Sequence, residues 1–126
     1  MDRYAVVGNP INHSKSPFIH AKFAEQTGED LRYEAVLGSL GGFADTVHTL
    51  RDKGFKGFNV TVPFKEEAWR MCDECSAQAR RAVAVNTVEM RPDGALAGHN
   101  TDGVGLVRDL VSNPGVELAD KRILIV

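Results

Sequence analysis

The sequence has 126 residues, of which 43% are hydrophobic and 25% are charged, and its formal net charge is −2. This length and composition suit one globular domain, and the charge excludes the strongly basic surface that nucleic acids and anionic membranes attract. We therefore expect neither a nucleic-acid nor a membrane partner. The N-terminal residues MDRYAVVGNP lack the apolar core of a signal peptide, so the cytoplasm is the expected location.

The first 72 residues alternate between apolar strands and amphipathic helices. In the first helix we expect Ser16 as the N-cap, Pro17 in the first turn and Gly28 as the stop signal. The alternation predicts right-handed βαβ crossovers and a largely parallel sheet. The expected strands are 3–8, 31–37 and 57–62, and the expected helices are 17–27, 41–53 and 64–72.

The pattern changes in the second half. VAVNTVEM and ALAGHN flank the turn signal Arg-Pro-Asp-Gly, which predicts an antiparallel hairpin. A helix is expected over 101–111, and SNPG at 112–115 ends it. KRILIV at 121–126 is typical of the start of a buried strand. The expected fold class is α/β: a three-layer α-β-α domain with a mixed, mostly parallel sheet.

Cys72 and Cys75 form a C-x-x-C pair in the segment MCDECSAQAR. A zinc site needs two more ligands, and the four histidines lack the spacing that would supply them. A thioredoxin-like site needs the pair at the end of a strand, opening a helix in an electropositive setting. Here the spacer is Asp-Glu and the flanks are helical in pattern. We therefore expect two reduced thiols on or near a helix and no metal site.

Two segments place polar residues where an open α/β sheet binds ligands, beyond the carboxyl ends of its strands. Ser14 and Ser16 precede a helix whose positive N-terminal end suits a carboxylate or a phosphate. The alternative is that Ser16 only caps the helix. Asn59 and Thr61 share one face of a strand that should otherwise be apolar. They suit the hydroxyl groups of a small ligand.

One lysine and two further segments complete the set of candidate site residues. Lys65 stands at the head of a helix, where a lysine opposes the helix dipole, which indicates a role other than local stability; a solvated surface lysine is the alternative. Asn86 interrupts an apolar strand. Asn100, Thr101 and Asp102 crowd a helix start, where Thr101 or Asp102 could be a simple cap. Together the segments resemble a site for a polyhydroxylated acid, with Lys65 and Asp102 available for proton transfer.

GNPINHSKSPFIH, GFNVTVPFK, AVNT and GHNTDGVG, in this order and spacing, resemble the substrate-binding half of shikimate dehydrogenase. The resemblance runs from about residue 4 to about residue 110. It implies an oxidoreductase that uses NADPH to reduce 3-dehydroshikimate to shikimate, a step toward chorismate and the aromatic amino acids. Ala84 and Ala21 depart from residues that are frequent in the family, and neither is an expected ligand contact.

The resemblance also implies residue roles. Ser14 and Ser16 would hold the substrate carboxylate. Lys65 and Asp102 would be the catalytic pair, with Lys65 transferring the proton that accompanies hydride transfer and Asp102 orienting the lysine. The implied substrate-binding residues are Ser14, Ser16, Asn59, Thr61, Lys65, Asn86, Thr101 and Asp102.

The resemblance further implies two domains. Residues 1–111 would form the substrate-binding and catalytic domain, and 112–126 a linker and the first strand of an NADP-binding Rossmann domain. The glycine-rich turn that should follow this strand is not among the 126 residues. We therefore expect NADP to bind a C-terminal domain outside this chain, and these residues alone to be inactive. Ile123–Val126 would be disordered, displaced or paired with another copy of the chain.

Two alternative functions stay open. A quinate/shikimate dehydrogenase of the same superfamily, which in some cases prefers NAD, would have similar residues in this half. A non-catalytic module that binds a hydroxy acid or mediates assembly would have less need of a proton donor. Lys65 and Asp102 therefore favour the enzyme over the module.

Overall fold

Six strands and five helices make up the molecule, and the computed structural model describes all residues from 1 to 126. In chain order the elements are β1 (Asp2–Gly8), α1 (Ser16–Thr27), β2 (Leu31–Leu37), α2 (Phe43–Asp52), β3 (Gly57–Val60), α3 (Lys65–Met71), β4 (Glu74–Cys75), α4 (Ala77–Ala82), β5 (Thr87–Met90), β6 (Leu96–His99) and α5 (Asp102–Ser112).

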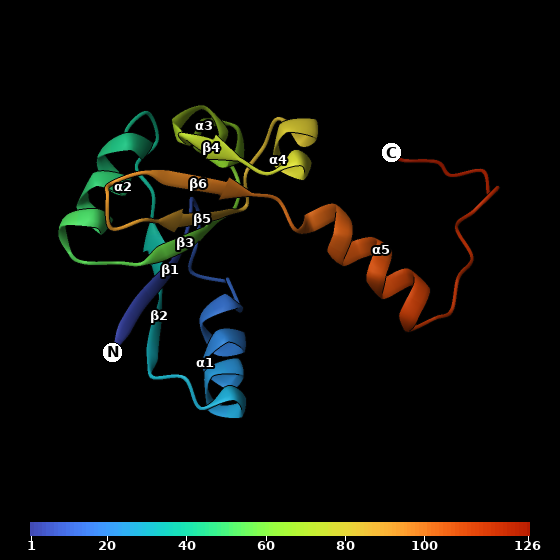
Figure 1. Ribbon diagram of the computed structural model, residues 1–126, viewed down its shortest axis with the longest axis horizontal. Coiled ribbons are helices and arrows are strands. Elements are labelled where there is room, and N and C mark those ends of the chain that lie inside the picture. The colour runs from blue at the N-terminus through green and yellow to red at the C-terminus, as the bar shows by residue number, and fades with distance from the viewer.

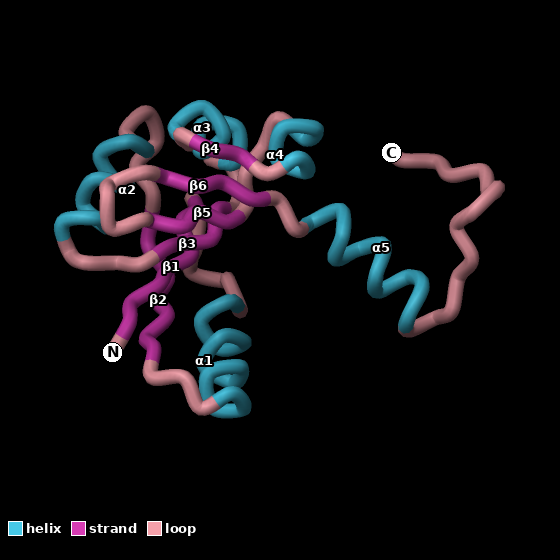
Figure 2. Tube along the Cα trace, viewed as in Figure 1, coloured by secondary structure: helices cyan, strands magenta, loops and turns pink.

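The strands form one sheet in the order β2-β1-β3-β5-β6-β4 (Figures 1 and 2). Every neighbouring pair is parallel except the two pairs that include β5, which runs antiparallel to β3 and β6. The expected α/β fold with a mixed, mostly parallel sheet and one hairpin is therefore confirmed. Since β5 is reversed, its first residue lies at the same sheet edge as the last residues of β1, β3 and β6.

The hydrophobic core lies on one face of the sheet, under α2 and α3. Strand alternation directs Val7, Phe58 and Val60 to this face, where they pack with apolar residues of the two helices. Phe43 of α2 stacks on Phe64, with ring centroids 5.0 Å apart. Helix α1 lies on the opposite face, beside β2 and β1 (Figure 1), so helices flank the sheet on both sides.

The start of α1 differs from the prediction. The helix begins at Ser16, so Ser16 is not its N-cap; Lys15 occupies that position and makes no side-chain cap hydrogen bond. Instead, Ser14 Oγ accepts a hydrogen bond from the Ser16 backbone N–H at 3.3 Å. Pro17 fits the first turn because it needs no backbone donor there. Gly28 ends the helix with φ 73°, in the left-handed conformation that its position predicts.

Strand β3 ends at Val60, two residues before the predicted end. Val62 is 68% exposed and does not continue the buried face of Phe58 and Val60. The Phe64 backbone N–H donates to the Thr61 carbonyl at 3.0 Å, which closes a turn between β3 and α3. Pro63 has no N–H for a strand ladder, so the strand stops before it.

The segment between α3 and β5 contains β4 and α4, which the sequence patterns did not predict. Cys72 follows the last residue of α3, and Cys75 lies in β4, which pairs with β6. Ser76 caps α4 by accepting a hydrogen bond from the Ala79 N–H at 3.1 Å. Both thiols are free, and burial raises the pKa of Cys72 to about 12. Nowhere do three His, Cys, Asp or Glu side chains converge in an arrangement that could hold a metal ion.

Helix α5 and the residues after it extend away from the sheet (Figure 1). The valines that the pattern places on one stripe of this helix, Val104, Val107 and Val111, are 45%, 49% and 50% exposed. The strand predicted at 121–126 is not formed, and Ile123–Val126 are exposed. A strand needs a neighbour for its backbone donors and acceptors, and this segment has none. None of the helices has both the length and the apolar composition needed to cross a bilayer.

Candidate active site at the carboxyl edge of the sheet

The predicted site residues lie at one edge of the sheet. Ser14 and Ser16 follow β1, and Lys65 follows β3 across a short turn. Asn86 immediately precedes β5, and Asp102 follows β6. The reversed direction of β5 brings Asn86 to this edge, because the start of an antiparallel strand lies beside the ends of its neighbours.

Lys65 and Asp102 form an ion pair, with Lys65 Nζ donating to Asp102 Oδ2 at 2.7 Å. The two residues are the first of α3 and α5. A carboxylate is favourable at a helix N-terminus and an ammonium is not, so Asp102 also offsets the unfavourable position of Lys65. Their side chains are 34% and 53% exposed, so a ligand can reach both. Such an exposed pair contributes about 1 kcal/mol or less to stability.

Asn86 holds the other oxygen of Asp102. Its Nδ2 donates to Asp102 Oδ1 and to Thr101 Oγ1, both at 2.9 Å. Its Oδ1 accepts from the Thr101 backbone N–H and from the Thr87 hydroxyl, both at 3.0 Å. These four bonds use both donors and both acceptor positions of the amide. Asn86 therefore positions Asp102, and it can contact a ligand only by exchanging one of these bonds.

Asn100 ties the start of α5 to the segment before β5. Its Oδ1 accepts from the Asp102 backbone N–H at 3.0 Å, and its Nδ2 donates to the Ala84 carbonyl at 3.0 Å. Both ends of the amide are thus bonded within the protein. The Asp102 carboxylate is consequently fixed through its backbone as well as through its side chain.

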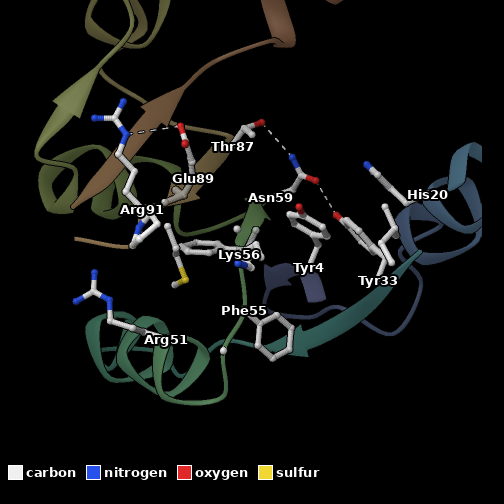
Figure 3. A pocket seen from close by; sticks show the side chains of 17 residues that line it. Tyr4, His20, Tyr33, Arg51, Phe55, Lys56, Asn59, Thr87, Glu89 and Arg91 are labelled. Carbon is white, nitrogen blue, oxygen red and sulfur yellow. Dashed lines mark hydrogen bonds and ion pairs between the residues drawn. The ribbon is translucent and has the colours of Figure 1, made fainter. Parts of the chain in front are cut away.

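The hydrogen-bonded network continues across the sheet to residues that the sequence patterns did not single out. Asn59 Nδ2 donates to Thr87 Oγ1 at 3.0 Å and to the Asn86 carbonyl at 3.2 Å. Asn59 Oδ1 accepts from the Tyr33 hydroxyl at 2.7 Å (Figure 3). Asn59 and Thr87 are direct partners in the β3–β5 register. The feature of the sequence that could have indicated Tyr33 and Thr87 is that they, like Asn59, are polar residues on the same face of neighbouring parts of the sheet, in β2, β5 and β3.

The serine segment approaches this network through His20 of α1. His20 Nδ1 lies 2.9 Å from the Ser16 carbonyl oxygen, and since a carbonyl only accepts, Nδ1 is the protonated nitrogen. The His20 ring stacks on Tyr33, with centroids 4.0 Å apart and an interplanar angle of 6°. Burial raises the pKa of the Tyr33 hydroxyl, and a hydrogen bond with the Ser16 side chain partly offsets that shift.

Comparison with known proteins identifies the family. The family model for the shikimate dehydrogenase substrate binding domain matches residues 6–88. The chain belongs to this family. A shikimate dehydrogenase (NADP(+)) from Thioalkalivibrio sulfidiphilus is 58% identical over 125 residues, which are 99% of this chain and 46% of that protein. The chain therefore spans about half the length of the curated relatives that it matches.

Solved structures agree with this membership of the shikimate dehydrogenase family. An Ael1 enzyme from Pseudomonas putida superposes with a TM-score of 0.91 at 44% identity, covering 97% of this chain and 45% of that chain. A shikimate 5-dehydrogenase from Thermus thermophilus, in complex with shikimate, superposes with a TM-score of 0.86 at 38% identity, covering 96% of this chain and 46% of that chain.

Not all residues that the family resemblance indicates lie in the network. Asn59, Lys65, Asn86, Thr101 and Asp102 are joined by side-chain hydrogen bonds. Thr61 makes no side-chain hydrogen bond, and its methyl group lies against Gly8, where an added Cβ would be 2.4 Å from Thr61 Cγ2. The sequence motifs thus locate the Lys65–Asp102 pair, and the structure adds Tyr33, Thr87 and His20.

A cavity of about 740 Å³ lies next to the network, on the sheet face that α1 partly covers (Figure 3). Tyr33, Asn59 and Thr87 line it, together with residues such as Tyr4 and Lys56 nearer the opposite sheet edge. Lys65, Asp102, Ser14 and Ser16 do not line this cavity. Lys65 and Asp102 therefore lie outside the cavity wall. Tyr33, Asn59 and Thr87 belong both to that wall and to the hydrogen-bonded network.

Proposed function

We propose that this chain is the substrate-binding half of an NADP-dependent shikimate dehydrogenase, which reduces 3-dehydroshikimate to shikimate on the route to chorismate and the aromatic amino acids. The observation that carries the proposal is the ion pair of Lys65 and Asp102, 2.7 Å apart at the carboxyl edge of the sheet. The names of its relatives support the substrate and the cofactor.

The Lys65 ammonium suits the role of proton donor. NADPH, when bound, supplies the hydride, and negative charge then develops on the ketone oxygen of the substrate. Lys65 donates a proton to that oxygen, and in the reverse direction the neutral amine accepts it. An ammonium has three N–H groups, and only the one that Asp102 accepts is used within the protein. Two donors are left for the substrate.

The remaining free donors indicate which side chains bind the substrate directly. Ser14 Oγ accepts from the Ser16 N–H, and Thr101 Oγ1 accepts from Asn86, so both hydroxyl protons are free to bond a ligand. Ser14 and Ser16, beside the N-terminus of α1, bind the substrate carboxylate. Thr61 and Thr101 bind ring hydroxyls.

The two amides of the predicted set are less available to a ligand. Both N–H groups of Asn59 and of Asn86 are bonded within the protein. In this proposal Asn59 and Asn86 contact the substrate only by exchanging one of those bonds. Their first role is to hold the groups around them in place.

No segment of these 126 residues suits the pyrophosphate of NADP. The one Gly-x-Gly pair, Gly103 and Gly105, lies inside α5 and not in a turn between a strand and a helix. The proposal therefore assigns NADP binding to a second domain. The length of the relatives supports this assignment, because the matched residues are only 46% of such a protein. In this proposal residues 1–111 are the substrate domain, and residues 112–126 are the linker and the segment that becomes the first strand of the second domain when that domain supplies neighbouring strands.

Titration of shikimate into the ¹⁵N-labelled chain, followed by amide chemical shifts, tests the proposal. We expect saturable shifts around Ser14–Ser16, Asn59–Lys65 and Thr101–Asp102, and their loss in Lys65→Ala. Lys56→Ala is the matched control and should leave binding unchanged. Lys56 precedes β3 and Lys65 follows it, so the two lysines lie at opposite ends of this strand. A folded chain that shows no shifts with shikimate would refute the assignment of the substrate. A stronger response to quinate would favour the quinate/shikimate alternative.

A further inference from the structure

The two tyrosines of this chain occupy equivalent positions but have different contacts. Tyr4 of β1 and Tyr33 of β2 are direct partners in the parallel register, and both line the same cavity (Figure 3). Only the Tyr33 hydroxyl donates a hydrogen bond to another side chain, at 2.7 Å to Asn59 Oδ1. The ring of Tyr33 is also held in place by its stacking on His20. The hydroxyl group of Tyr33 is therefore placed for a specific role.

The bonds that start at Tyr33 all have the same direction. Tyr33 donates to Asn59, Asn59 donates to Thr87, Thr87 donates to Asn86, and Asn86 donates to Asp102. Each residue of the chain therefore donates to the next one, and the last acceptor is the Asp102 carboxylate. Hydrogen bonds in such a chain polarise one another in the direction that favours a negative charge at its end. The chain thus ends on the Asp102 carboxylate oxygen Oδ1, while Lys65 donates to the other oxygen, Oδ2.

The same tyrosine adjoins the serine segment. His20, which stacks on Tyr33, bonds the carbonyl oxygen of Ser16 through Nδ1 at 2.9 Å. Tyr33 therefore lies between the residues assigned to the substrate carboxylate and the residues assigned to proton transfer. A change at Tyr33 can reach both parts of the site through direct contacts.

We propose that Tyr33 is a positioning residue of this site: its hydroxyl orients the Asn59 amide and, through Thr87 and Asn86, holds the Asp102 carboxylate beside Lys65. The effect on substrate affinity rests on the proposed function, whereas the coupling from Tyr33 to Asp102 does not. Tyr33→Phe removes the first donor of the chain. Thr87→Val, which keeps the branched shape of the side chain, removes the middle one.

The test uses the ¹⁵N,¹³C-labelled chain without ligand and then with shikimate. Two signals report the coupling, namely the side-chain amide of Asn86 and the carboxyl carbon of Asp102. We expect Tyr33→Phe and Thr87→Val to shift both signals and to raise the Kd for shikimate about fivefold to tenfold, the effect of one lost hydrogen bond. Tyr4→Phe is the matched control and should leave both signals and the Kd unchanged.

The outcomes separate coupling from packing. If Tyr33→Phe and Thr87→Val, folded as judged by their backbone amide spectra, leave the Asn86 and Asp102 signals at their wild-type positions, Tyr33 only packs in the sheet and the proposal is wrong. If Tyr33→Phe does not fold, Thr87→Val alone decides the coupling in the same way. If the wild-type chain does not bind shikimate, the proposed function fails, and the ligand-free spectra still decide whether Tyr33 is coupled to Asp102.

Discussion

The bond between Asn86 and Asp102 offers a sharp test of the site. Asn86→Asp keeps the size and shape of the side chain but replaces the Nδ2 donor with a carboxylate oxygen. In the present structure Nδ2 lies 2.9 Å from Asp102 Oδ1. The substitution therefore converts a charge-assisted hydrogen bond into a contact between two negative charges.

The expected cost has two parts. Coulomb repulsion of two unit charges at this separation is about 1.4 kcal/mol in bulk water and about 6 kcal/mol at an effective dielectric constant of about 20. Because the Asp102 side chain is 53% exposed, we expect a value near the lower bound, about 2 kcal/mol. Loss of the hydrogen bond to a charged group adds about 1.5 kcal/mol. Asn86→Asp should therefore lower the free energy of unfolding by about 3.5 kcal/mol at pH 7.

Urea unfolding as a function of pH measures this cost. The new carboxylate raises the pKa of one member of the pair, so the deficit should be full at pH 7 and should shrink as acid protonates that group. Asn86→Asp/Asp102→Asn restores one charge and one amide, and we expect it to recover most of the lost stability. Asp102→Asn alone is the control for the lost ion pair. A variant as stable as wild type, or a deficit that does not depend on pH, would refute the reasoning.

Three further predictions concern the domain as a whole. Gly98→Ala should cost about 1–3 kcal/mol of stability, because the new Cβ would lie 2.7 Å from Cys72 Sγ. Gly103→Ala is the control, since its Cβ meets nothing within 4 Å. Equal urea midpoints for the two variants would contradict the predicted clash. Burial raises the pKa of Cys72 to about 12, so the stability that the neutral thiol contributes is present below pH 9 and is lost as the pH rises toward 12. Cys72→Ala should therefore lose less stability than the wild type between pH 9 and pH 12. Parallel curves of stability against pH for the two proteins would contradict this prediction. The 126-residue chain should not reduce NADP with shikimate, since it lacks a dinucleotide-binding turn; measurable NADPH absorbance from the pure chain would place the cofactor site within these residues.

Local patterns in the sequence were sufficient to predict the frame of this domain. Apolar alternation and turn residues predict β1, β2, β3 and the β5–β6 hairpin, because strand periodicity and turn chemistry depend on neighbours along the chain. The polar motifs predict Lys65 and Asp102 as a pair, since residues that follow parallel strands meet at one sheet edge. The N-cap of the first helix was predicted wrongly. Pro17 favoured Ser16 as the cap, but the helix begins at Ser16, and Ser14 Oγ accepts the hydrogen bond of the Ser16 backbone N–H.

Only the tertiary structure decided which polar groups are already bonded. The reversed direction of β5 brings Thr87 opposite Asn59 and places Asn86 beside Asp102. Tyr33 joins them through β2, which lies two strands away from β3 in the sheet. Hydrogen bonds between distant segments depend on register and strand order, which follow from the packing of the whole sheet. KRILIV illustrates the same limit: its residues are typical of a strand, but a strand forms only where a neighbouring strand accepts its backbone hydrogen bonds.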